Sequence, residues 1–278
     1  MDSQSMLLLS RQLAIGYYEG PYAIPSGPDF SYAEYTRIIA ARQADSDIAR
    51  KERAYWFSRL DTLPGPLRLP HKNGATMTVQ HPGFRNQLHR IDSARWAAVR
   101  HQITSRGLEP STVLMVVFAE MLSMQSGQNH FCFNVKFQDR VRGIHDEVDD
   151  IVGNFDAAML AEMDFRDGGE MLVQRARRVQ KMVLEDLAHS SLVTATQVTA
   201  ELNKRRDTPH KTYSPVTFES KFPLVRKLKK MDSQDRMFLF EPLVEENVTY
   251  HNHATAGMEL DHQVRTPVII PGICRDCH

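Results

Sequence analysis

The sequence predicts a mixed α/β fold in which helices pack on a shared sheet. Segments with apolar residues at helical spacing fill much of the first half of the chain, and short apolar runs typical of strands lie near residue 130 and toward the end. Paired helices followed by strands that return to one sheet are typical of this class. With 278 residues, of which 42% are hydrophobic and 24% charged, the chain can form one large globular domain or two lobes with separate cores.

The first part of the chain is expected to be helical, with helices at residues 5–18, 32–42 and 48–60. Residues 21–31, rich in Pro, Gly and Ser, are expected to form a loop. The third helix ends before LPGPLRLP, residues 63–70. Prolines there lack an amide donor and clash with a preceding helical turn, so this stretch is predicted to be an extended connector.

Two paired helices are expected in the middle of the chain. A strand near residues 84–91 leads to a helix that Ser93 caps and Gly107 ends. A second helix, capped by Ser111, runs over residues 113–126. Its apolar residues extend almost all round, which predicts a central buried helix.

The remaining residues supply the sheet. A continuously apolar strand, of the kind buried on both faces, is expected at residues 130–137, followed by an amphipathic helix at 169–189. Three further strands are expected to close the fold, at residues 212–220, 236–240 and 247–264. The best domain boundary lies near residues 91–93, between a helical N-terminal portion and a more complete C-terminal lobe.

Composition argues against several classes of function. Lys+Arg and Asp+Glu both number 34, so no net field draws the chain to nucleic acid or to a membrane surface. No segment approaches the ~20 apolar residues that cross a bilayer. Three cysteines do not make a disulfide framework, so we expect a cytoplasmic protein. The basic run RKLKK, residues 226–230, is interpreted as a solvated turn, with docking on an acidic partner as the alternative.

The C-terminus carries a C-x-x-C-H motif, formed by Cys274, Cys277 and His278. This is the haem-attachment pattern, but we expect neither haem nor another bound metal, because a chain terminus is a poor platform for ligands. Zinc held by these residues with His251 or His253 is the minor alternative, since histidines at i, i+2 point to one face of a strand.

Residues 134–164 form the most informative segment. A strand, a basic corner and an acidic loop lead to Gly153-Asn154-Phe155-Asp156, which an apolar run follows. Glycine lets the backbone turn tightly or approach a substrate closely. A plain turn with a buried Phe155 accounts for the same residues, so the pattern alone leaves both interpretations open.

A series of short motifs extends over nearly the whole chain: Y-W-F-S-R-L, LPGPLRLP, G-L-E-P-S, G-N-F-D, D-L-A-H, P-V-T-F-E-S and L-D-H-Q. In order and spacing they resemble the motifs of heterocyclization domains of nonribosomal peptide synthetases, a branch of the condensation-domain superfamily. The family patterns are Y-W-x-x-R-L, L-P-x-x-P-x-L-P, G-L-T-P-S, G-D-F-T, D-L-x-H, P-V-V-F-T-S and L-D-x-Q.

The resemblance implies a chain truncated at both ends. Asp2 and Ser5 resemble the second half of D-x-x-x-x-D-x-x-S and are interpreted as a remnant of that motif. The implied fold is the chloramphenicol-acetyltransferase-like condensation fold. Residues 1–91 would be a remnant of its N-terminal lobe, residues 92–264 most of its C-terminal lobe, and residues 265–278 a divergent tail.

The resemblance also implies a reaction and partners. Carrier proteins, next to other synthetase domains, bring two thioesters on phosphopantetheine arms, and the domain itself binds no cofactor. The family joins the upstream acyl group to a Cys, Ser or Thr, whose side chain then closes a thiazoline or oxazoline with loss of water, in siderophore or peptide-antibiotic biosynthesis. Proton transfer belongs to the Thr of P-V-V-F-T-S and the Asp of L-D-x-Q, which fall on Glu219 and Asp261 here.

The departures from the family predict impaired activity. Glu219 replaces the family Thr, and Asn154 and Asp156 replace the Asp and Thr of G-D-F-T. The catalytic candidates are Asp261, Glu219 and Gln263; the candidates for lining the substrate tunnel are Asn154, Asp156 and Ser220. An inactive module that docks a carrier protein or neighbouring domain is the alternative. A complete acyltransferase acting on a free small molecule is disfavoured, because the H-H-x-x-x-D-G motif is missing.

Overall fold

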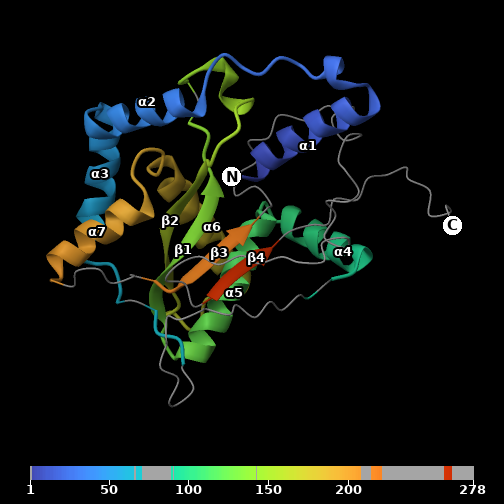
Figure 1. Cartoon of the computed structure of the whole chain (residues 1–278). Coiled ribbons are helices and arrows are strands. Elements are labelled where there is room, and N and C mark those ends of the chain that lie inside the picture. Colours follow the sequence, from blue (N-terminus) through green and yellow to red (C-terminus); the bar gives the residue numbers. More distant parts are fainter. Residues whose placement is uncertain are drawn as a thin grey trace.

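A four-stranded sheet with strand order β2-β1-β3-β4 forms the centre of the described part of the chain. The strands are β1 (His130–Gln138), β2 (Asp156–Asp164), β3 (Val216–Ser220) and β4 (Leu260–Val264). Because β1 pairs antiparallel with β2 but parallel with β3, and β3 parallel with β4, the strands β1, β3 and β4 end at the same edge (Figure 1). The computed structural model describes residues 2–65, 67–70, 89, 91–141, 143–207, 214–220 and 260–264.

Helices surround this sheet (Figure 1). Within the described residues they are α1 (Ser3–Tyr18), α2 (Tyr32–Ala44), α3 (Asp47–Arg59), α4 (Ser93–Thr104), α5 (Pro110–Ser126), α6 (Leu172–Ala188) and α7 (Ala195–Arg205), with short 3-10 turns η1 (Pro21–Ala23) and η2 (Asp146–Asp149). Every helix predicted from apolar spacing is confirmed. The strands predicted at 84–91 and 236–240, and most of the one at 247–264, lie outside the described residues.

The predicted caps of the two paired helices are wrong. Asp92, one residue before Ser93, caps α4 by accepting the amide hydrogen of Arg95 at 2.8 Å. The N-cap position of α5 is Glu109, and Ser111 is buried inside the helix. The proline that follows Glu109 explains this earlier start, because its fixed φ and missing amide hydrogen suit the first turn of a helix.

Burial of α5 is one-sided, contrary to the prediction of a helix buried all round. Met115 and Val116 are fully buried, whereas Val117, Met121 and Met124 are 46%, 41% and 83% exposed. The buried side packs on the sheet, where Phe118 lies 4.4 Å from the ring of His262 on β4.

Two elements were not predicted from the sequence, β2 and α7. The sequence of β2, DAAMLAEMD, contains alanine, methionine and leucine, which favour helices. It forms a strand because all nine of its residues pair with β1. This pairing overrides local propensity.

The main hydrophobic core joins residues on both sides of the predicted boundary at 91–93. Trp56 and Leu60 of α3 belong to the same buried cluster as Phe131 and Phe133 of β1 and Phe218 of β3. The division into residues 1–91 and 92–264 stays a prediction. A second, smaller cluster joins α2, η2 and the Gly153 turn.

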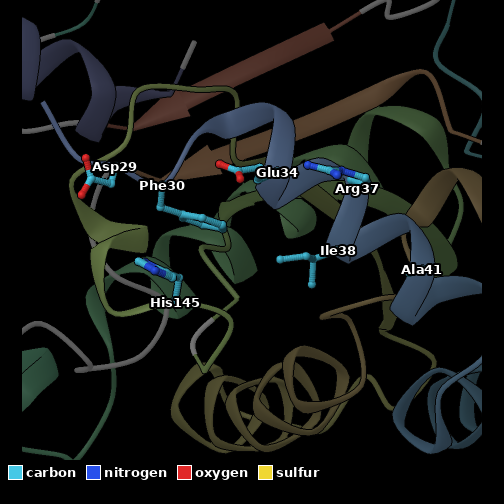
Figure 2. A pocket seen from close by; sticks show the side chains of 7 residues that line it. All are labelled: Asp29, Phe30, Glu34, Arg37, Ile38, Ala41 and His145. Atoms are coloured by element: carbon cyan, nitrogen blue, oxygen red, sulfur yellow. The ribbon is translucent and has the colours of Figure 1, made fainter.

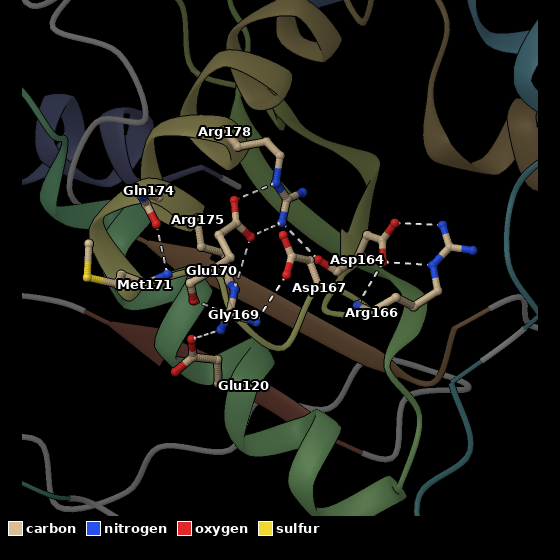
Figure 3. A network of polar contacts seen from close by, with 10 residues as sticks. All are labelled: Glu120, Asp164, Arg166, Asp167, Gly169, Glu170, Met171, Gln174, Arg175 and Arg178. Atoms are coloured by element: carbon tan, nitrogen blue, oxygen red, sulfur yellow. Dashed lines mark hydrogen bonds and ion pairs between the residues drawn. The ribbon is translucent and has the colours of Figure 1, made fainter.

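Charged side chains fix the connection between β2 and α6 (Figure 3). Glu170 accepts hydrogen bonds from Arg178 Nη2 at 2.8 Å and from Arg175 Nε at 3.4 Å. Arg175 also forms an ion pair with Glu120 of α5. The network therefore ties the start of α6 to α5.

Among the described residues, no helix combines the length and apolar character needed to cross a membrane.

Candidate active site

Polar side chains line one face of the three parallel strands. Thr217 of β3 lies opposite Asp261 of β4, and Glu219 lies opposite Gln263. On the other side of β3, Asn134 and Lys136 of β1 are in register with Thr217 and Glu219. Alternate residues of a strand point to the same face, so these six residues share one face of the sheet, the polar face.

An ion pair crosses the polar face. Lys136 Nζ lies 3.4 Å from Asp261 Oδ2, and the two side chains are 21% and 8% exposed. Lys136 is also the register partner of Glu219. The structure thus brings together the three catalytic candidates Asp261, Glu219 and Gln263 and adds a cation that the sequence analysis missed. The sequence does contain a pattern that could have predicted Lys136 as a site residue, because Asn134 and Lys136 stand at alternate positions of an otherwise largely apolar strand.

The opposite face of these strands is apolar and covered. Phe218 and His262 pack against Phe118 of α5, with ring centroids 5.8 and 4.4 Å away. Burial lowers the pKa of His262, although the neighbouring Asp261 acts in the opposite direction. Ser220, a predicted tunnel residue, is the last residue of β3 and follows Glu219 directly, so alternation places its side chain away from the polar face.

Asp2 and Ser5, which were interpreted as part of a family motif, lie beyond the end of β1, where Arg140 binds them. Arg140 Nη2 lies 3.2 Å from both carboxylate oxygens of Asp2 and 3.1 Å from Ser5 Oγ. Ser5 Oγ in turn accepts the amide hydrogen of Gly153 at 2.9 Å and donates to the Gly153 carbonyl oxygen at 3.0 Å. Figure 1 shows the start of α1 beside this end of β1. The interactions are those of an anchor between α1 and the Gly153 turn.

The turn itself is closely packed. A Cβ on Gly153 would lie 2.2 Å from Tyr32 Cδ2. Phe155 is buried, and the guanidinium of Arg140 lies 3.8 Å from the centroid of its ring. The structure shows a tight turn with a buried Phe155, in which Gly153 is needed for the close packing of Tyr32. The approach of Gly153 to a substrate stays a prediction.

Asn154 precedes β2 in the Gly153 turn, and Asp156 is the register partner of Gln138, so Asp156 is on the same side of the sheet as Lys136 but at the β2 edge. Asn154 and Asp156 line a hollow of about 210 Å³ together with Tyr32, Tyr35 and Ser191. Asp156 begins β2, while Asp261 is on β4, and β1 and β3 lie between these strands. The structure therefore does not bring these predicted tunnel residues next to the catalytic candidates.

A larger hollow, of about 500 Å³, lies between α2 and the chain around His145 (Figure 2). The rings of Phe30 and His145 stack at 4.4 Å, and Glu34 and Arg37 of α2 also line it. It contains none of the residues predicted to act in the site.

The candidate zinc ligands and the basic run at residues 226–230 lie outside the described residues.

Two motifs that carried the family resemblance, Y-W-F-S-R-L on α3 and D-L-A-H at the end of α6, are hydrogen-bonded to each other. Tyr55 Oη donates to Asp186 Oδ1 at 2.6 Å, and Arg59 Nη1 donates to the same oxygen at 2.5 Å. Burial raises the pKa of Asp186, although Arg59 opposes the shift. Burial and the hydrogen bond with Asp186 raise the pKa of Tyr55. The contacts connect α3 to α6 and thus place the N-terminal helices on the sheet domain.

Comparison with known proteins agrees with this architecture. A family model, described as a condensation domain, matches residues 1–220, so Asp261 lies beyond the matched segment. Pyochelin synthetase PchF from Pseudomonas aeruginosa is 29% identical over 201 residues, which cover 71% of this chain and 11% of that protein. Phenyloxazoline synthase MbtB from Mycobacterium tuberculosis is 27% identical over 220 residues, covering 79% and 15%. The chain thus spans a small part of these relatives.

Solved structures share the fold. The EpoB cyclization-docking bidomain from Sorangium cellulosum superposes with a TM-score of 0.68 at 24% identity, covering 79% of this chain and 43% of that one. This likeness confirms the predicted condensation-domain fold.

Proposed function

The chain belongs to the condensation-domain family, and from this we propose that it is part of a heterocyclization domain of a nonribosomal peptide synthetase. The substrates would be an acyl thioester and a Cys, Ser or Thr thioester, each carried on the phosphopantetheine arm of a carrier protein in the cytoplasm. The product would be a thiazoline or oxazoline in a siderophore or peptide antibiotic. Relatives named as a pyochelin synthetase and a phenyloxazoline synthase support this branch of the family.

One observation carries the proposal, the position of Asp261 on the polar face with Glu219 and Gln263 on adjacent positions of β3 and β4. Ring closure needs a group that accepts the proton of the attacking side chain, and Asp261 is the carboxylate we assign to it. Its side chain is 8% exposed, so little water competes for the proton. Gln263 would hold the amide oxygen through its side-chain amide, and Glu219 stands where the family has a hydroxyl.

Reconstitution with two loaded carrier proteins tests the proposal. We expect the acceptor carrier to gain the acyl mass and then to lose one water, at a reduced rate because Glu219 replaces the family Thr. Intact-protein mass spectrometry measures both mass changes. Asp261→Asn should slow the loss of water about 100-fold, because general-base catalysis contributes about 10²–10⁴-fold. Asp45→Asn, at an exposed carboxylate, is the matched control. Absence of both mass changes with the unmodified protein would reject heterocyclization.

A further inference from the structure

Lys136 is placed to take part in the chemistry of the polar face. The strand β3 lies between β1 and β4, so the Lys136 ammonium reaches Asp261 across β3. It is also in register with Glu219 on the neighbouring strand β3, so it is next to one candidate carboxylate and pairs with the other. With 21% of its side chain exposed, Lys136 retains access to a bound molecule.

The other residues of the polar face differ from Lys136 in what they donate. An ionised carboxylate, as in Asp261 or Glu219, only accepts hydrogen bonds. The amides of Asn134 and Gln263 donate hydrogen bonds but do not release a proton. Ammonium groups both donate and release protons, so among the described residues of this face Lys136 is the cationic acid.

We propose that Lys136 is a catalytic residue that protonates the departing hydroxyl during ring dehydration, an inference that rests on the proposed function. In this step the bond between the ring carbon and its exocyclic hydroxyl oxygen breaks while the ring nitrogen loses its hydrogen. Lys136 gives a proton to the leaving hydroxyl, which departs as water, and Asp261 takes the proton from the ring nitrogen. A carbon–nitrogen double bond forms, and the step needs no oxidant or reductant.

The ion pair then resets the site. After the step Asp261 is protonated and Lys136 is a neutral amine, and the proton returns from the carboxyl to the amine over their 3.4 Å separation.

A preformed N-acyl-cysteinyl carrier removes condensation from the assay, so that only ring closure and loss of water remain to be catalysed. Lys136→Met removes both the charge and the proton. Lys136→Arg keeps the charge and its pairing with Asp261, but a guanidinium does not release a proton in proteins. With both variants we expect the carrier-bound intermediate to lose water about 100-fold more slowly than with the unmodified protein. Lys51→Met, at an exposed lysine of α3, should dehydrate the intermediate at the rate of the unmodified protein.

The outcomes separate this inference from the proposed function. If the unmodified protein dehydrates the intermediate and Lys136→Arg does so equally fast, Lys136 acts only through its charge and the proton-donor role is rejected, while heterocyclization stands. If the unmodified protein does not dehydrate the intermediate, both heterocyclization and the proton-donor role of Lys136 are rejected.

A measurement without turnover tests the ion pair itself. Competitive labelling with acetic anhydride should modify Lys136 several-fold more slowly than Lys51, and Asp261→Asn should raise the labelling of Lys136. Unchanged labelling in Asp261→Asn would overturn the inference, whatever the activity.

Discussion

Replacing Arg140 with methionine should destabilise the protein by about 3 kcal/mol. Arg140 and Asp2 are nearly inaccessible, with side chains 5% and 0% exposed. The guanidinium also donates to the carbonyl oxygens of Val148 and Ile151 at 2.7 and 2.8 Å. Methionine has a similar length but donates nothing, which leaves a buried carboxylate without its cation. Breaking a buried pair by removing one partner costs about 3–5 kcal/mol. We expect the lower value, because Asp2 still accepts the amide hydrogen of Ser5.

Urea denaturation followed by circular dichroism measures this loss, with Arg100→Met at an exposed arginine of α4 as the control. Asp2→Asn and the double variant complete a double-mutant cycle, in which the double variant should cost at least about 1 kcal/mol less than the sum. Hydrogen exchange gives a local readout, since the amide hydrogens of Ser5 and Gly153 should exchange faster in Arg140→Met. Strict additivity, or a loss under about 1 kcal/mol, would refute the anchor.

Three further predictions concern packing, a buried carboxylate and pH. Gly153→Ala should destabilise by about 1–3 kcal/mol in urea denaturation, because the new methyl overlaps the ring of Tyr32, whereas Gly168→Ala, which meets no atom within 4 Å, should not. Glu52 is 2% exposed and accepts the amide hydrogens of Leu192 and Val193 at 2.7 and 2.9 Å, so Glu52→Gln should cost about 1.5–3 kcal/mol and lower the melting temperature, unlike Glu19→Gln at an exposed site. Burial lowers the pKa of His262 in the folded state, so the unfolded chain takes up a proton first as pH falls below about 6.5, and stability should decrease there. Melting at pH 7.5 and 5.5 checks this, and a pH dependence unchanged in His262→Phe would contradict it.

Sequence periodicity predicted β1 and the helices other than α7, because these elements are set by local patterns. The sequence of α6 places apolar residues on one side of the helix, and β1 is a run of apolar residues long enough to form a buried strand. The strand β2 escaped prediction because its Ala, Met and Leu residues favour a helix, and only its pairing with β1 makes it a strand. The predicted N-caps failed by one or two residues, because Asp92 stands next to Ser93 and caps α4, and because Pro110 starts α5 directly after Glu109.

The catalytic candidates were found through motif order, whereas their contacts depend on residues far apart in the sequence. Lys136 and Asp261 are 125 positions apart, and Arg140 and Asp2 are 138 apart. No local pattern encodes such a pair, since the sheet register decides which side chains meet. Motif order likewise made Asn154 and Asp156 candidates for lining the substrate tunnel, which stays a prediction; in the sheet, β1 and β3 lie between Asp156 and Asp261.

β1 connects the anchor and the candidate active site. Lys136 lies on the polar face within the strand, and four residues later Arg140 binds Asp2 and Ser5. The strand is held rigidly between them, because it pairs with β2 along its whole length and with β3 at Asn134, Val135 and Lys136. Loss of Arg140 should therefore release α1 and the Gly153 turn, while sheet pairing keeps Lys136 beside Asp261. Changes at Lys136 should have the opposite character, affecting the reaction while the anchor stays intact. The same strand thus serves stability at its end and chemistry in its middle, and the two roles can be separated by mutation.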